Sequence, residues 1–418
     1  MNKTWKLYIL RCGDGSLYTG IAVDVQARLE AHRSGKGAKY TRGRGPLELV
    51  YTEECGDHSA ALRREIQIKK LTREQKDAFL QDPTLFLPEQ TICVTKTASN
   101  DMIEKKGGTA MRKSLLIHPE ELNKKWIDRM VDLEIDTLAL HPVGGRIAHQ
   151  TLADLLERAK TKEFRDLADY ACSRGLKLEY EVHAGSWLLP REEFEAHPDW
   201  RRVDTDGIRN PKGNFCVSQP DALEYVCNRA AELAEGLYRS ENSYYFWLDD
   251  GKDLRCHCEK CSKLSASDQQ LLVMNGIVRR LREKDPEAKL AYLGYYACME
   301  VPKQVKPKAG IFLEYAPIDR KFDRPVSQQL GESAKMLLAL RDFFGTENAK
   351  VLEYWYDNSL FSKWTKPPKA FVPDNDLIRE DVAYYHSLGF DYISSFACYL
   401  GEDYEELYGE PDISAFQK

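Results

Sequence analysis

The sequence predicts an α/β protein of two modules, a small α/β unit followed by a (β/α)8 TIM-like barrel. The first reason is length, because 418 residues suit a barrel of roughly 250 residues plus a smaller module. The second is a break in charge. Residues 1–80 contain 15 Lys and Arg against 10 Asp and Glu, a balance of +5, and the remainder has a balance of −11. The third is a series of eight strand-like runs beyond residue 110, with amphipathic helical patterns between them.

The composition is that of a soluble protein without a membrane partner. Charged residues make up 30% of the chain, and no apolar run approaches the roughly 20 residues that span a bilayer. Strand-like sequence begins at Trp5 without a secretory signal before it. The eleven cysteines are scattered apart from one cluster, as in a chain with reduced thiols. We therefore expect a cytoplasmic protein whose basic first module favours an anionic partner.

The first 80 residues follow the order strand, strand, helix, strand, helix, helix. Asp14-Gly15 is a turn signal between the first two strands, and Asp24 is a favourable N-cap for the first helix. A basic, glycine-rich loop, SGKGAKYTRGRGP, precedes the third strand. The predicted elements are residues 5–11, 16–22, 24–32, 47–54, 59–71 and a short helix from Thr72.

Two tripeptides in the predicted strands carry a specific resemblance. Leu7-Tyr8-Ile9 and Tyr18-Thr19-Gly20 resemble the signature tripeptides of the GIY-YIG nuclease superfamily. The resemblance to its small, single-domain bacterial branch extends over residues 4–80, including the loop KGAKYTRGRGP and the helix ALRREIQIKKL. It implies a GIY-YIG nuclease-like domain over residues 1–82 that cleaves phosphodiester bonds with Mg²⁺.

The resemblance also implies roles for individual residues. Tyr8 and Tyr18 fall on the signature tyrosines, and one of them, preferentially Tyr8, assists the attacking water. Arg28 falls on the arginine that faces the scissile phosphate, His32 shares its helix face, and Glu65 falls on the single metal-binding carboxylate. This set suits the reaction, which needs a positioned nucleophile, a cation at the developing charge and a metal for the leaving oxygen. One carboxylate is compatible with Mg²⁺, which usually keeps several waters.

A second hypothesis is that this module only binds nucleic acid. Each site residue has a structural alternative, since a strand tyrosine is usually core and Glu65 has an i,i+4 partner in Lys69. Four basic side chains of the glycine-rich loop fit either hypothesis, because they would contact backbone phosphates without reading sequence. They are Lys36, Lys39, Arg42 and Arg44.

Residues 83–111 lack periodicity and are predicted to form a linker that is partly disordered. The segment from Met111, MRKSLLIHPEEL, is typical of a chain start, and codons for Lys106-Gly107-Gly108 can spell a ribosome-binding sequence just before it. One hypothesis is that two neighbouring reading frames became one, and the alternative is an ordinary glycine-rich linker. A Gly107 codon other than GGA would remove the first hypothesis.

Residues 112–418 are predicted to form the barrel. Strands that alternate with helices favour a parallel sheet, and eight repeats favour its closure. The strand-like runs are residues 114–118, 137–141, 176–183, 244–250, 289–296, 311–316, 351–356 and 391–396. The amphipathic stretches are 120–132, 151–174, 220–238, 267–284, 328–344 and 375–388, with a weak closing helix near 404–408.

Polar and aromatic residues gather at the carboxyl ends of these runs, where barrel enzymes carry their sites. Carboxylates beside tryptophan platforms suit a carbohydrate, whose acetal is cleaved by paired acids. Each residue alone has a structural alternative, and a non-catalytic, glycan-binding barrel is a third hypothesis. The residues are His118, His141, Glu181, His183, Asp249, Asp250, Tyr295, Tyr296, Glu314, Tyr315, Glu353 and Asp357, with Trp187, Trp247, Trp355 and Trp364 near the same rim.

The barrel resembles an uncharacterised glycoside-hydrolase-like family related to alpha-glucuronidases. The resemblance is carried by WLDDG, CHCEKC, LLVMNGIVRRL and LAYLGYY, within residues 240–320. It implies a glycan-processing barrel in which Asp250, or its neighbour Asp249, is the acid after the fourth strand. Our choice for the partner carboxylate is Glu314 on the sixth strand, with Glu353 on the seventh as its rival.

Three clustered cysteines, Cys256, Cys258 and Cys261, have the spacing of a partial metal site. Tetrahedral zinc needs four ligands, so a residue distant in the sequence would have to complete it. Structural zinc, reduced thiols and a disulfide are all compatible with the sequence. If zinc binds, we expect it to hold the loop beside Asp250 rather than to catalyse.

Overall fold

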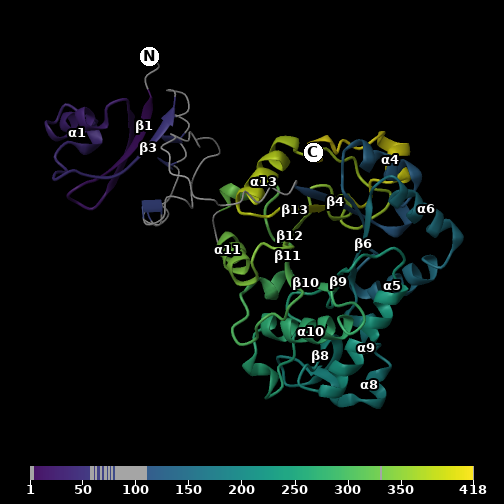
Figure 1. Cartoon of the computed structure of the whole chain (residues 1–418). Coiled ribbons are helices and arrows are strands. Elements are labelled where there is room, and N and C mark those ends of the chain that lie inside the picture. The colour runs from purple at the N-terminus through teal and green to yellow at the C-terminus, as the bar shows by residue number, and fades with distance from the viewer. Residues whose placement is uncertain are drawn as a thin grey trace, which may run out of the picture. The chain divides into compact units, whose positions relative to one another are not determined.

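A computed structural model describes residues 4–56, 61, 64, 65, 68, 69, 73, 76, 79, 80, 111–329 and 332–417. Its contacts divide the chain into two compact units, Met1–Lys105 and Lys106–Lys418, which run from purple to yellow in Figure 1. Apart from Met111, the predicted linker 83–111 lies outside the described residues. Within the described part of the chain, no helix is long and apolar enough to cross a membrane.

The first unit is built on a three-stranded antiparallel sheet in the order β2-β1-β3. Alternate residues of β1 face opposite sides, so Tyr8 and Leu10 pack with helix α1 (Val25–Arg33) while Leu7 and Ile9 pack with Ile68 and Phe79. The predicted strands are therefore present, with small shifts at their ends. They are β1 (Trp5–Arg11), β2 (Leu17–Ala22) and β3 (Glu48–Gly56).

Helix α1 (Val25–Arg33) begins where the sequence predicts it. The Asp24 side chain accepts a hydrogen bond from the Ala27 backbone N–H at 2.9 Å, which satisfies one of the unpaired donors of the first turn. The glycine-rich loop then forms a single turn of 3-10 helix, η1 (Lys39–Thr41). This loop and α1 lie against the same face of the sheet as Tyr8.

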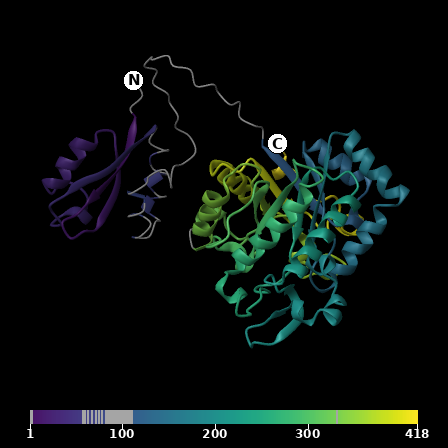
Figure 2. The same cartoon turned by 60° about the horizontal axis from the view of Figure 1, so that its bottom comes forward.

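The second unit is a closed barrel of eight parallel strands, in the order β10-β11-β12-β13-β4-β5-β6-β9. All eight predicted runs form these strands, and pairing of β13 with β4 closes the barrel. Figure 2 shows the strands with helices on their outer side. The strands are β4 (Arg112–Ile117), β5 (Thr137–Leu140), β6 (Lys177–His183), β9 (Ser243–Trp247), β10 (Lys289–Gly294), β11 (Ile311–Tyr315), β12 (Lys350–Glu353) and β13 (Tyr392–Phe396).

The outer helices also follow the predicted stretches, with residues 151–174 divided into two helices. Between β10 and β11 the crossover contains only a 3-10 turn, η7 (Tyr296–Met299), as its short, proline-rich sequence predicts. The main helices are α4 (Lys124–Asp132), α5 (Ala148–Arg158), α6 (Lys162–Ser173), α9 (Pro220–Gly236), α10 (Ala266–Leu281), α11 (Glu332–Phe344), α13 (Asn375–Ser387) and α14 (Glu402–Tyr408).

A two-stranded hairpin, β7 (Arg201–Val203) and β8 (Arg209–Phe215), lies between β6 and α9 and was not predicted. The sequence of β8, RNPKGNF, does not predict a strand, because proline and glycine are poor strand formers and apolar alternation is absent. The loop after β9 holds the hairpin in place: its His257 backbone N–H donates a hydrogen bond to the Val203 carbonyl at 2.7 Å. Tertiary contacts, rather than local propensity, therefore define this element.

The barrel interior contains a buried ionic network centred on Lys350. Its Nζ pairs with Glu181, lies 3.2 Å from Glu179 Oε2 and lies 3.9 Å from Glu314 Oε1. Burial raises the pKa of Glu314 well above its usual range. Burial also acts to lower the pKa of Lys350, but the three carboxylates hold it above its ordinary value. One ammonium among three carboxylates thus favours at least one protonated carboxyl group.

Candidate functional site

The first candidate site lies in the small unit, where β1, α1 and η1 meet. The Tyr8 hydroxyl and His32 Nε2 share a hydrogen bond of 2.9 Å. The other ring nitrogen, Nδ1, lies 2.7 Å from Thr41 Oγ1. Because both Tyr8 and His32 are almost fully buried, the imidazole is fixed between the sheet and the glycine-rich loop.

The glycine of the second tripeptide makes room for the tyrosine of the first. Tyr8 is paired with Gly20 across β1 and β2. A Cβ atom at Gly20 would lie 2.6 Å from the Tyr8 hydroxyl oxygen and 3.1 Å from the Tyr18 ring. The motif is therefore one packing unit, in which glycine permits the tyrosine ring to lie across the neighbouring strand.

Arg28 and Tyr18 complete this cluster. Burial raises the pKa of Tyr8 to about 12, and a hydrogen bond from the exposed Arg28 opposes that rise. Burial, together with the Arg28 charge, lowers the pKa of His32, so its ring is neutral near pH 7. The Tyr18 ring lies 5.0 Å from the His32 ring. The structure thus brings together Tyr8, Tyr18, Arg28 and His32.

Glu65 lies on the helix after β3 and is engaged in an ion pair. Its Oε1 accepts a hydrogen bond from Lys69 Nζ at 2.8 Å, which is the i,i+4 contact of the structural alternative. The carboxylate is 14% exposed, whereas Lys69 is 53% exposed. A divalent cation at Glu65 would therefore displace an exposed ammonium rather than a buried partner.

Of the four basic residues predicted to contact phosphate, three are exposed and one is ion-paired. Lys36, Lys39 and Arg42 are exposed on the glycine-rich loop. Arg44 instead pairs with Asp14 at 2.6 Å and covers the Tyr40 ring, so its charge is partly neutralised.

Tyr40, which sequence reasoning missed, is 45% exposed and stacks on Tyr18 with a ring separation of 6.0 Å. The sequence feature that could have indicated Tyr40 is an aromatic residue among the basic residues of the loop, a combination typical of nucleic-acid-binding surfaces. Its stacking connects the exposed loop to the tyrosine cluster.

The second candidate site is the carboxyl end of the barrel, where three histidines lie at the ends of β4, β5 and β6. Each donates its Nδ1–H to a backbone carbonyl: His118 to His141 and His141 to Glu181, both at 2.7 Å, and His183 to Leu248 at 3.0 Å. Burial, with the neighbouring histidines, lowers the pKa of His141 well below its usual range. The neutral His141 ring therefore keeps Nε2 as a hydrogen-bond acceptor.

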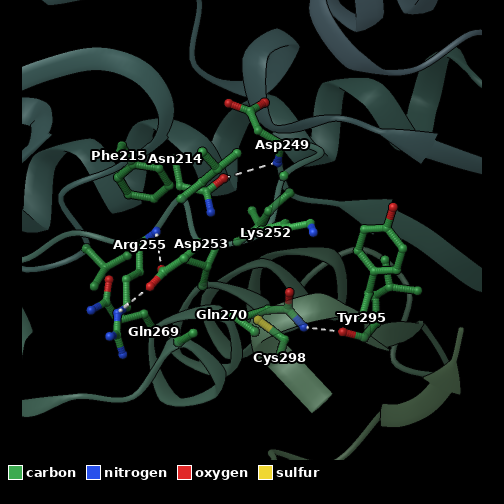
Figure 3. Close-up of a pocket in the computed structure, with 18 of the residues that line it drawn as sticks. Asn214, Phe215, Asp249, Lys252, Asp253, Arg255, Gln269, Gln270, Tyr295 and Cys298 are labelled. Carbon is green, nitrogen blue, oxygen red and sulfur yellow. Dashed lines mark hydrogen bonds and ion pairs between the residues drawn. The ribbon is translucent and has the colours of Figure 1, made fainter. Parts of the chain in front are cut away.

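Asp249 and Asp250 follow β9 at the same end but have different surroundings. Asp249 forms an ion pair with Arg191, and its N–H donates to Asn214 Oδ1 at 3.1 Å (Figure 3). Asp250 is exposed and accepts a hydrogen bond from the Tyr295 hydroxyl at 3.1 Å. Of the two, Asp250 is the carboxylate that a ligand reaches without breaking an ion pair.

Both predicted partner carboxylates are buried. Glu314 is fully buried and accepts a hydrogen bond from Trp247 Nε1 at 2.7 Å, in the network of Lys350. Glu353 is also fully buried and bonds to Arg320 at 3.0 Å and Tyr385. Glu314 thus faces the barrel interior and Glu353 faces helix α13, because consecutive positions on a strand alternate between the interior and the outer helices.

Three of the four predicted tryptophan platforms are buried. Trp187, Trp247 and Trp355 are at most 9% exposed, and only Trp364, after helix α12 (Asn358–Phe361), is largely exposed. Trp187 is covered by the Arg229 guanidinium, 3.9 Å from its ring centre. Large aromatic residues near strand ends are buried more readily than sequence position alone suggests.

A pocket lies beside Asp249, between the loop after β9, strand β8 and helix α10 (Figure 3). Its polar lining comes from elements distant in the sequence. The lining includes Asn214, Asp249, Lys252, Asp253, Gln270 and Tyr295.

The predicted cysteine cluster has a fourth member at the end of β8. The sulfur atoms of Cys216, Cys256, Cys258 and Cys261 lie within 4.8 Å of one another, a group that could hold a metal ion. Cys216 follows the hairpin that sequence patterns did not reveal, so its proximity to residues 40 or more positions away could not be predicted. All four are free cysteines, which excludes the disulfide alternative in this structure.

Comparison with known proteins identifies a different family for each unit. The GIY-YIG catalytic domain model matches residues 4–77, and the domain of unknown function DUF4838 matches residues 151–406. The UPF0213 protein of Streptococcus sanguinis is 53% identical over 83 residues, covering 20% of this chain and 94% of the relative. The UPF0213 protein YhbQ of Escherichia coli O1:K1 is 46% identical, covering 20% of this chain and 82% of the relative.

Solved structures give matches for both units. The solution structure of a UPF0213 protein from Bacillus halodurans is 47% identical, covers 19% of this chain and 83% of its own, and has a TM-score of 0.14. A β-galactosidase from Rahnella sp. R3 is 14% identical, covers 69% of this chain and 50% of its own, and has a TM-score of 0.40. The chain therefore belongs to the GIY-YIG superfamily through its first unit, a homologue of the UPF0213 proteins, and to the DUF4838 family through its barrel.

Proposed function

We propose that the first unit is a divalent-metal-dependent endonuclease that cleaves phosphodiester bonds in nucleic acid. The observation that carries this proposal is the hydrogen bond between the Tyr8 hydroxyl and neutral His32, beside the exposed Arg28. A phenol that stays protonated at neutral pH can pass its proton to the imidazole while its oxygen takes one from water. This arrangement activates a nucleophile without requiring a tyrosinate at rest.

The remaining residues have complementary roles in this proposal. Arg28 presents a planar, bidentate cation to the scissile phosphate. Mg²⁺ held by Glu65 would supply positive charge at the leaving oxygen. Lys36, Lys39 and Arg42 hold the nucleic-acid backbone, and the exposed Tyr40 offers a face on which a base can stack.

Nicking of supercoiled plasmid by the full chain in Mg²⁺ tests this function. We expect nicking by the wild type and its loss in Glu65→Ala. Glu30→Ala is the matched control, because Glu30 is an exposed carboxylate of the same unit whose partner is Arg33. Plasmid binding without nicking by the wild type would instead support the hypothesis that this unit binds nucleic acid without turnover.

We further propose that the barrel acts on a carbohydrate at its carboxyl end, with Asp250 as the acid. Three observations support a sugar site: the row of imidazoles at the strand ends, the exposed carboxylate of Asp250 and the adjacent Tyr295 hydroxyl. Hydroxyl groups of a sugar match such a mixture of acceptors and donors. Asp249 is better suited to holding Arg191 and the loop than to proton transfer.

Uronic-acid and amino-sugar glycosides are the first substrates to screen. Hydrolysis by the wild type, lost in Asp250→Asn and kept in Asp206→Asn, would support an acid role; Asp206 is an exposed residue of the β7–β8 turn. Binding of a glycan without hydrolysis would favour the alternative of a non-catalytic, glycan-binding barrel.

A further inference from the structure

We propose that Cys216, Cys256, Cys258 and Cys261 bind one structural zinc ion that fastens the loop after β9 to the β7–β8 hairpin. This inference is independent of both proposed activities, since it concerns only the cysteine cluster and the segments joined there. It also identifies the distant ligand that the spacing of the other three cysteines requires.

The sulfur separations fit a single tetrahedral ion. Cys216 Sγ lies 3.6 Å from Cys258 Sγ and 3.9 Å from Cys261 Sγ. Zinc–sulfur bonds of about 2.3 Å in a regular tetrahedron place the sulfurs about 3.8 Å apart. A disulfide would need about 2.05 Å, and an iron–sulfur cluster would spread its ligands well beyond the 4.8 Å that encloses all four sulfur atoms.

Hydrogen bonds from outside the cluster already orient the ligand segments. Gln269 of helix α10 donates to the carbonyls of Cys256 and Cys261, at 2.8 and 3.0 Å, and accepts from the Cys256 N–H at 2.9 Å. The Val203 N–H donates to Cys256 Sγ at 3.3 Å. Such outer contacts are typical of metal sites, where they fix the ligands and stabilise negative charge on sulfur.

The composition of the cluster indicates a structural role. Four thiolates leave no position for water or substrate, which is the pattern of closed zinc sites. Cys216, Cys256 and Cys261 are buried, and Cys258 is half-buried, so the ion would be shielded from solvent. His257 lies beside the cysteines in sequence, but its ring approaches Asp253 at 4.0 Å and is not needed as a ligand.

The ion would stabilise one wall of the pocket in Figure 3. Asn214, two residues before Cys216, holds the Asp249 backbone through its side-chain oxygen. Asp249 and Asp250 begin the loop that ends in the other three cysteines. Through Cys216 the zinc would hold the chain next to Asn214, and through the other three cysteines it would hold the end of the loop that begins at Asp249. It would therefore keep Asn214 and Asp249 in contact.

Metal analysis of the purified full chain tests the site itself. We expect one zinc per chain after exhaustive desalting, and loss of that zinc in Cys216→Ser. Cys172→Ser is the matched control, because Cys172 is a half-buried cysteine of α6 outside the cluster. A wild type without stoichiometric zinc that also fails to take up Co²⁺ as a tetrahedral thiolate complex would overturn the proposal, and stoichiometric iron would overturn the choice of zinc.

A second measurement covers the case in which Cys216→Ser does not fold. Titration of the wild type with an organomercurial should release one zinc as four thiols react, with release followed by a coloured chelator. In hydrogen exchange, zinc removal should raise exchange in residues 201–219 and 248–265 while β4 and β13 stay protected. Unchanged exchange in those two segments after zinc release would contradict the proposed fastening.

Discussion

The Tyr8 hydroxyl and His32 Nε2 lie 2.9 Å apart, across the boundary between the central strand and the first helix of the GIY-YIG unit. Each is held from its other side, Tyr8 by Arg28 and His32 by Thr41. A strand residue and a helix residue thus form one hydrogen-bonded pair in the buried part of the site, and the proposed function assigns proton transfer to it. The proposed proton transfer can be tested by small substitutions at or beside this pair.

Tyr8→Phe removes only the hydroxyl oxygen and should lower the rate of plasmid nicking by about 10²- to 10⁴-fold, the usual contribution of general acid–base catalysis. Tyr51→Phe is the matched control, because Tyr51 bonds to Glu53 in the same sheet but packs in the apolar cluster on its opposite face. A rate in Tyr8→Phe within a few-fold of the wild type would exclude Tyr8 from proton transfer.

The pH dependence of nicking should show an acid limb below pH 6.5. Burial and Arg28 lower the pKa of His32 from 6.5, so the ring is neutral above its folded-state pKa and loses its acceptor as pH falls through that value. His32→Gln cannot titrate, so its residual rate should lack this limb. A wild-type rate that falls already between about pH 8 and 7 would contradict a lowered pKa.

Gly20→Ala should impair nicking more than folding. The added methyl group would lie 2.6 Å from the Tyr8 hydroxyl oxygen, which must move away from His32. A displacement of about 1 Å at a catalytic group costs on the order of 10²-fold in rate. Gly45→Ala is the control, because a Cβ there meets no atom within 4 Å. Thermal unfolding of both variants would show whether lost activity reflects lost structure.

The order and approximate bounds of the barrel strands could be predicted because each run is short, largely apolar and bounded by turn residues. How deeply the polar side chains of these strands are buried could not be predicted from the sequence. Glu314 and Glu353 occupy strand positions that sequence patterns place near the mouth, yet both are fully buried, one bonded to Trp247 and the other to Tyr385 of α13. Which way a strand position points depends on register and tilt in the closed barrel, which no single strand encodes.

The small unit was more predictable because its site comes from contiguous motifs. Tyr8, Tyr18, Arg28 and His32 lie within 25 residues and meet through one strand pair and one helix. Cys216 shows the opposite case, because its partners follow it by 40 or more residues and its hairpin has no strong local signal. Long-range metal ligands are found from a sequence only when every segment that carries them is recognisable.

Glu353→Gln should reduce the pH dependence of barrel stability. Burial raises the pKa of Glu353 from 4.5 to about 7, although Arg320 opposes the rise. The folded chain therefore holds a proton that the unfolded chain loses, so this stabilising contribution is complete below pH 4.5 and is lost as pH rises through about 7. Chemical unfolding across this range should show a smaller slope in Glu353→Gln than in the exposed control Glu195→Gln.

Lys350→Met should destabilise the barrel by about 3–5 kcal/mol, because it leaves buried carboxylates without their cation. Lys350 is fully buried, and Glu181, Glu179 and Glu314 surround its ammonium group. Lys289→Met on β10, two strands from β12 in the barrel, is the control, since Lys289 is only half-buried and bonds to Asn348. Adding Glu181→Gln to Lys350→Met should recover part of the lost free energy of unfolding, because one uncompensated charge is removed. If the double variant is less stable than Lys350→Met alone, the network is held by packing rather than by charge.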